Sequence, residues 1–80
     1  MNNTFAGNFT RLRKERKFTQ ERLAEALGVS FQAVSKWETA QTYPDIGLLP
    51  RIAGLLATSV DSLLGYAPVK RDITDYENRL

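Results

Sequence analysis

The stretch from Thr19 to Glu38 constrains the fold most, because one glycine divides it into two short segments with helical spacing. The apolar residues of the two segments are Leu23, Ala24 and Leu27 before Gly28, and Val34 and Trp37 after it. Residues three or four apart lie on the same side of an α-helix, so each segment has one apolar side. Helices this short do not persist alone in water, because nucleation is costly and each further residue gains little. The stretch therefore predicts two short helices that pack on each other and on the flanking chain.

Three residues indicate where these two helices begin and where the chain turns. Thr19 and Ser30 precede the two segments, and a Ser or Thr there accepts a hydrogen bond from an N–H group of the first turn. Gly28 stands just after the first segment, where helices commonly end in a residue with positive φ that glycine adopts without a steric penalty. Phe18 and Val29 precede the two caps, as in a hydrophobic staple. These signals agree on a sharp turn at Gly28.

Apolar spacing predicts three further helices, so the chain is expected to be all-α. The first begins after the polar residues 1–4, which are expected to fray, and the fifth is capped by Ser59 and ended by Gly65. The fourth is expected from about residue 48 to about residue 57 after a looser turn, because Pro50 is tolerated only in a first turn. The apolar positions are Phe5, Phe9 and Leu12 in the first helix, Leu48, Leu49, Ile52, Leu55 and Leu56 in the fourth, and Val60, Leu63 and Leu64 in the fifth.

The composition argues against catalysis and metal binding. The 80 residues include no histidine and no cysteine, which removes the commonest general base and the commonest metal ligands. There is also no glycine-rich phosphate loop and no paired-carboxylate motif. We therefore expect no enzyme activity, no metal and no cofactor. The chain has no apolar run long enough for a bilayer and no signal-peptide character, and its lack of cysteine fits the reducing cytoplasm, where we expect it to be located.

Positive charge is concentrated in one short run. Five of the eleven Lys and Arg residues lie between Arg11 and Lys17, although the net charge of the chain is only +2. In most proteins such a run is a solvated helix face. Beside two helices joined by a tight turn, it also suits a phosphate backbone, which attracts Lys and Arg. The residues alone leave both interpretations open.

The pattern from Gln20 onward resembles the helix-turn-helix of the phage repressor/Cro family, also called the XRE family. Counting Gln20 as the first position, the family has a small residue at the fifth, glycine at the ninth and a branched apolar residue at the fifteenth. The residues here are Ala24, Gly28 and Val34. A small residue at Ala24 lets the two helices approach closely. The flanking segments LRKERKFTQ, KWE, YPDI and VDSLL also look like this family.

The resemblance extends over residues 9–64 and implies a fold, a partner and a set of contacts. The fold is a compact five-helix bundle of the lambda-repressor-like type, in which helices 2 and 3 form the helix-turn-helix. The partner is double-stranded DNA, with the start of the third helix on base edges in the major groove. By position, the base-reading residues are Phe31, Gln32, Ser35 and Lys36, and the phosphate contacts are Gln20, Arg11, Lys14 and Lys17. Arg13 and Glu38 stand where this family has a structural pair between the first and third helices.

Two of these assignments have alternatives, and one segment departs from the family. Phe31 can contact a thymine methyl group or pack against the protein, and Ser35 can read a base or simply face solvent. Family members often have Asn-Gly after the third helix, whereas Thr39 and Ala40 stand here. The loop over residues 39–44 has therefore lost the residues best suited to positive φ.

We interpret residues 1–65 as a sequence-specific DNA-binding domain of a transcriptional regulator, expected to act as a homodimer through the fifth helix and Tyr66. That surface can equally belong to the intramolecular core. Residues 66–80 are expected to be a linker or the start of a further helix or domain. Thr74 to Glu77 match a capping box with only three residues after it, so we expect a longer protein or a partner that completes the helix. The alternative functions are a DNA-targeting module of a longer effector protein and the antitoxin of a toxin–antitoxin pair.

Overall fold

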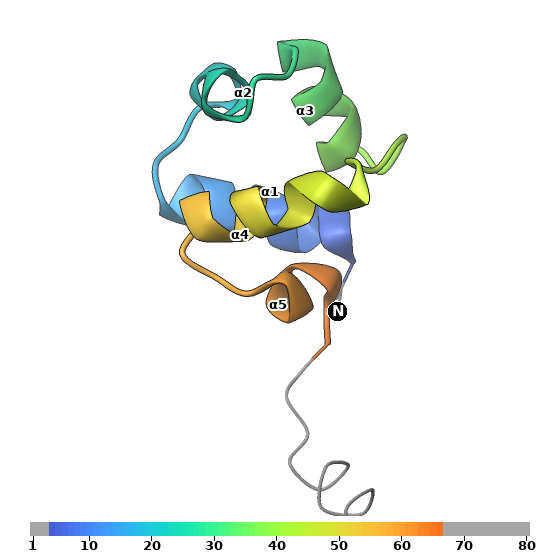
Figure 1. Ribbon diagram of the computed structural model, residues 1–80. Coiled ribbons are helices and arrows are strands. Elements are labelled where there is room, and N and C mark those ends of the chain that lie inside the picture. Colours follow the sequence, from blue (N-terminus) through green and yellow to red (C-terminus); the bar gives the residue numbers. More distant parts are fainter. Residues whose placement is uncertain (1–3, 67–80) are drawn as a thin grey trace, which may run out of the picture.

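The computed structural model describes residues 4–66, which form five α-helices and one 3₁₀ helix (Figure 1). They are α1 (Phe5–Glu15), α2 (Gln20–Leu27), α3 (Phe31–Glu38), η1 (Ile46–Leu48), α4 (Leu49–Leu55) and α5 (Val60–Leu64). No strand occurs within the described range, so the predicted all-α bundle is confirmed. The capping box predicted over residues 74–77 lies outside the described residues. None of the helices between Phe5 and Leu64 combines the length and the apolar character needed to cross a membrane.

The arrangement of the helices leaves α2 and α3 at one end of the molecule. In Figure 1, α1 and α4 cross the middle and α5 lies at the opposite end from α2 and α3. The α1 helix packs against both α3 and α5, whereas α2 packs against α3 and α4 packs against α5. The α1 helix is therefore the element that connects the helix-turn-helix to the rest of the bundle.

One apolar core connects the helices. Its largest fully buried side chains are Phe9, Leu23, Val34, Ile52, Leu56 and Leu63. The ring of Phe9 stacks on Phe5 at a centroid distance of 5.3 Å and meets Trp37 edge-on at 5.8 Å. Burying a large apolar side chain stabilises a fold by roughly 1.5–3 kcal/mol. Trp37 is thus a core residue, as predicted, and it holds α3 against α1.

Four of the helices begin at a hydroxyl side chain that caps the first turn. The hydroxyls accept hydrogen bonds at 3.0–3.2 Å from the backbone N–H group three residues further on. The capping residues are Thr4 for α1, Thr19 for α2, Ser30 for α3 and Ser59 for α5. The caps at Thr19, Ser30 and Ser59 were predicted. The expectation that residue 4 frays was wrong, because its side chain anchors the start of α1.

The α4 helix begins without a side-chain cap and is preceded by η1. Pro50 stands in its first turn, where a missing backbone N–H leaves no intrahelical bond unmade. This agrees with the predicted looser turn before the fourth helix. The α4 helix ends at Leu55, two residues before the expected end, and Leu56 and Ala57 form a turn instead.

All five α-helices end in the same backbone arrangement. A residue one or two positions past each helix has positive φ, and its N–H group and the next N–H group bond back to carbonyls of the last turn. These residues are Lys17 (φ 62°), Gly28 (φ 73°), Ala40 (φ 63°), Ala57 (φ 56°) and Gly65 (φ 89°). A residue other than glycine costs about 1–2 kcal/mol in this conformation. The loop after α3 therefore keeps the positive φ, with an alanine in place of the family's glycine.

A buried asparagine holds α5 against α1. Asn8 is only 5% exposed, and its side-chain Nδ2 donates to the carbonyl of Ser62 at 3.2 Å and to that of Leu63 at 3.1 Å. The last carbonyls of a helix have no partner within the helix. The Ser62 carbonyl also accepts from the Gly65 N–H at 3.2 Å, so Asn8 adds a second donor there and donates to the Leu63 carbonyl from a different helix. Sequence reasoning did not find this contact.

Candidate nucleic-acid interface

The turn between α2 and α3 brings the two helices into close contact. Ala24, the small residue of α2, is 3% exposed, and its carbonyl accepts a hydrogen bond from the Val29 N–H at 3.0 Å. Gly28 has the predicted left-handed conformation, and a Cβ atom there would meet nothing within 4 Å. Glycine is thus favoured at this position by its backbone conformation and not by lack of space. The helix breaks at Gly28, as the prediction required.

The α3 helix has one buried side and one side that faces solvent. Val34 and Trp37 are buried against the core. The four predicted base-reading residues occupy neighbouring positions around the rest of the helix, in the order Phe31, Ser35, Gln32 and Lys36. Gln32 and Lys36 are exposed, Ser35 is half-buried, and Phe31 is 42% exposed. Phe31 is therefore not a core residue, and the structure brings the four side chains together on one face of the helix, which we call the α3 face.

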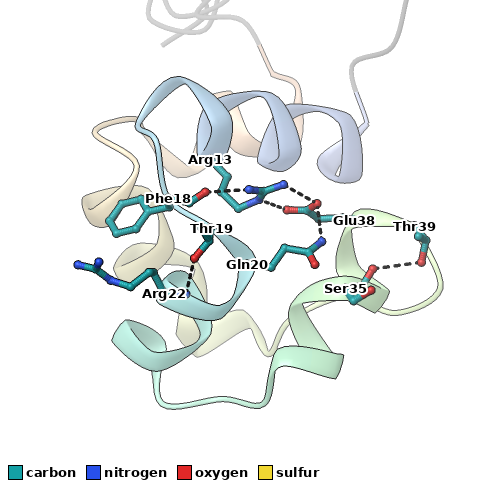
Figure 2. A network of polar contacts seen from close by, with 8 residues as sticks. All are labelled: Arg13, Phe18, Thr19, Gln20, Arg22, Ser35, Glu38 and Thr39. Atoms are coloured by element: carbon teal, nitrogen blue, oxygen red, sulfur yellow. Dashed lines mark hydrogen bonds and ion pairs between the residues drawn. The ribbon is translucent and has the colours of Figure 1, made fainter.

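Three polar side chains and one backbone carbonyl join α1, α2 and α3 (Figure 2). Arg13 donates from Nε to Oε2 of Glu38 at 2.5 Å and from Nη2 to Oε1 at 3.2 Å, and its Nη1 donates to the carbonyl of Phe18 at 2.8 Å. Gln20 donates from Nε2 to Oε1 of Glu38 at 2.9 Å. The side chains of Arg13 and Glu38 are only 11% and 8% exposed. We call Arg13, Gln20, Glu38 and the Phe18 carbonyl the polar clasp.

The polar clasp contains one predicted pair and shows a further contact of Gln20. The pair expected between Arg13 and Glu38 is present, and both side chains are occupied within the protein. Gln20, which the resemblance assigns to a phosphate, is half-buried and directs its amide nitrogen to Glu38. One N–H of that amide and its carbonyl oxygen remain for other partners. The bond between Gln20 and Glu38 was not predicted.

The predicted phosphate contacts other than Gln20 come from α1 and its end. Arg11, Lys14 and Lys17 are all exposed. Arg11 lies 3.4 Å from Oε2 of Glu15, but both side chains are more than half exposed (57% and 58%). Exposed pairs of this kind contribute little, so Arg11 is available to another anion. These three residues lie on α1 or just after it, and none of them belongs to α3.

Two further contacts support the helix-turn-helix and were missed from the sequence. Arg51 donates from Nη2 to the carbonyl of Ala26 at 3.1 Å, which satisfies a carbonyl of the last turn of α2 from α4. The hydroxyl of Thr39 donates to the carbonyls of Ser35 and Lys36, at 3.3 and 3.2 Å. Ala26 is 25 residues from Arg51, so no local pattern marks that contact.

Comparison with known proteins confirms the resemblance. A model of the helix-turn-helix family HTH_3 matches residues 10–63, which is most of the chain. The protein belongs to the helix-turn-helix family. The matched segment includes the turn at Gly28, the α3 face and the polar clasp.

Relatives of this helix-turn-helix protein include regulators that are longer than the aligned segment. It is 40% identical over 60 residues to the HTH-type transcriptional activator BcrR of Enterococcus faecalis. It is 35% identical over 60 residues to the uncharacterized HTH-type transcriptional regulator YqaE of Bacillus subtilis (strain 168). Each alignment covers 75% of this chain, but only 29% of BcrR and 52% of YqaE. The chain thus spans 29% to 52% of the length of these relatives.

Solved structures share the fold. A transcriptional regulator from Listeria innocua superposes with a TM-score of 0.75 and 30% identity, covering 100% of this chain and 81% of that one. The P22 c2 repressor in complex with the synthetic operator 9T superposes with a TM-score of 0.73 and 32% identity, covering 79% of this chain and 96% of that one. The predicted lambda-repressor-like bundle is therefore confirmed.

Proposed function

We propose that this helix-turn-helix protein binds specific sequences of double-stranded DNA through α3 and acts as a transcriptional regulator. The observation that carries the proposal is the two-sided character of α3. Val34 and Trp37 fix one side of the helix to the core, while Gln32 and Lys36 extend into solvent from the other. The major groove of B-DNA admits an α-helix presented in this way. The operator complex of the P22 c2 repressor, which has the same fold, supports this placement.

The side chains of the α3 face suit different base edges. The amide of Gln32 matches the paired donor and acceptor of adenine, and Lys36 can donate to the N7 and O6 acceptors of guanine. Each good contact of this kind contributes about 1–3 kcal/mol of discrimination against a wrong base. Phe31 is exposed enough to reach a thymine methyl group, and Ser35 can bond to several bases.

Phosphate contacts would come from exposed cations away from the α3 face. The exposed cations on α1 and just after it can contact phosphates without reading the base sequence; they are Arg11, Lys14 and Lys17. Each neutralised phosphate changes the slope of log affinity against log salt by about −0.9. Replacing Lys14 with alanine should therefore weaken binding to any duplex and flatten this slope by about 0.9.

Dimerisation and cellular location are further parts of the proposal. A two-fold dimer would place its half-sites about one turn of DNA apart, on the order of 34 Å. Leu64 and Tyr66 are 40% and 67% exposed at the end of α5, which supports this region as the contact between copies. A DNA-binding regulator of this kind would work in the cytoplasm. None of the proteins compared above favours an effector-fused module or an antitoxin.

Selection of bound duplexes from a random pool, followed by substitution of the α3 face, tests the proposal. We expect a recovered consensus, and palindromic symmetry would support the dimer. On that sequence, Gln32→Ala and Lys36→Ala should each weaken binding about tenfold, as expected for the loss of one base contact. Gln41→Ala removes an exposed glutamine just beyond α3 and is the matched control. Affinities within about twofold of wild type for both α3 variants would contradict the assigned face.

A further inference from the structure

Gln20 has its amide held in one orientation by the polar clasp. Its Nε2 lies 2.9 Å from Oε1 of Glu38, the oxygen that also accepts from Nη2 of Arg13 at 3.2 Å. An ionised carboxylate can only accept hydrogen bonds, so the nitrogen of the amide must face Glu38 and the carbonyl must face away. Figure 2 shows the Gln20 side chain extending from α2 toward the Glu38 carboxylate.

The bond between Gln20 and Glu38 connects opposite ends of the helix-turn-helix. Gln20 is the first residue of α2, and Glu38 is the last residue of α3. The turn at Gly28 joins the other two ends of these helices. Burial of Val34 and Trp37 in the core is apolar and mostly without directional preference, apart from the edge-on contact of Trp37 with Phe9. The hydrogen bonds of Glu38 are directional, so they restrict the angle at which α3 leaves the turn.

We infer that Gln20 is a positioning residue for base reading, because its bond to Glu38 sets the direction of α3. This inference rests on the proposed function. It adds to the phosphate contact expected of Gln20, since the second N–H of the same amide remains available to a phosphate oxygen. Gln20 would then connect the DNA backbone, through Glu38, to the helix that reads the bases.

The two roles of Gln20 differ in their effect on sequence discrimination. Loss of a phosphate contact weakens binding to all duplexes by the same factor, whereas a misdirected α3 mainly loses the selected sequence. For Gln20→Met we expect the ratio of specific to non-specific affinity to fall about tenfold. The control Glu25→Gln lies on the exposed side of α2 and should change both affinities equally. An unchanged ratio for Gln20→Met would refute the positioning role.

A second experiment uses the free protein and exchanges the two partners. Gln20→Glu places a second acceptor against Glu38, so we expect the equilibrium constant for unfolding in urea to rise about tenfold. The fluorescence of Trp37 monitors the unfolding. In a Glu38→Gln background the amide at position 38 can donate to the new carboxylate, so the same change should have little effect. Equal effects in the two backgrounds would show that the bond does not hold α3.

The two experiments also separate this inference from the proposed function. A wild-type protein that selects no DNA sequence would overturn the proposed function and the base-reading role of Gln20 together. A protein that selects a sequence and keeps its specificity ratio in Gln20→Met would overturn the inference alone. Coupling between positions 20 and 38, together with a lower ratio, supports both.

Discussion

Replacing Ala40 with glycine should stabilise the protein, although glycine usually weakens a fold. Ala40 follows α3 with φ 63°, is exposed, and donates its N–H to the Trp37 carbonyl at 3.3 Å. The left-handed conformation costs a non-glycine residue about 1–2 kcal/mol. Glycine loses about 0.5–1 kcal/mol more entropy on folding. We therefore expect Ala40→Gly to raise the free energy of unfolding by about 0.5–1 kcal/mol, because no packed side-chain contact is lost.

Thermal and urea unfolding can measure this effect against two controls. For a domain of 60–100 residues, about 1 kcal/mol corresponds to a shift in Tm of roughly 4–8 °C. Gly28→Ala should destabilise the protein by about 1 kcal/mol through its backbone conformation alone, because the added Cβ meets nothing within 4 Å. Ala26→Gly, inside α2, should cost about 1 kcal/mol in helix propensity. If Ala40→Gly destabilised the protein as much as Ala26→Gly, the strain assigned to the end of α3 would be absent.

Three further substitutions test individual contacts by urea unfolding. Asn8→Ala should cost about 1–3 kcal/mol, because it removes the buried amide that donates to the carbonyls of Ser62 and Leu63, and a change below the error of the fit would disprove that role. Arg13→Met should cost about 3–5 kcal/mol, because it removes the cationic partner of a nearly buried carboxyl group, that of Glu38, and wild-type stability would show that the ion pair does not hold the helices. Arg51→Met should cost about 0.5–1.5 kcal/mol, because the carbonyl of Ala26 loses its donor from α4, and removal of the exposed cation Lys14 is its control.

The local features of the fold could be predicted because their causes lie within a few residues. A capping hydroxyl bonds to an N–H three residues away, so Thr19, Ser30 and Ser59 mark the starts of their helices. Gly28 and Gly65 mark two of the helix ends for the same reason. The α3 face also follows from spacing, since burial of Val34 and Trp37 determines which residues of the helix remain outside.

The contacts between distant segments could not be predicted in this way. Asn8 reads as an ordinary polar residue until α5, more than fifty residues later, brings two carbonyls to its amide. Gln20 and Glu38 meet only after the chain turns at Gly28. The positive φ of Ala40 arises because the Gln41 N–H bonds to the Lys36 carbonyl at 2.9 Å, and this closure imposes the conformation on whichever residue precedes Gln41.

The bond from Asn8 to the end of α5 has a consequence for how the polypeptide folds during synthesis. A helix of five residues does not persist without outside contacts, so α5 requires α1. Conversely, the amide of Asn8 acquires its carbonyl partners only once residue 63 has left the ribosome. The contacts between α1 and α5 therefore form only at the end of synthesis of this domain. In a shorter nascent chain, α1 lacks the hydrogen bonds that Asn8 makes with α5.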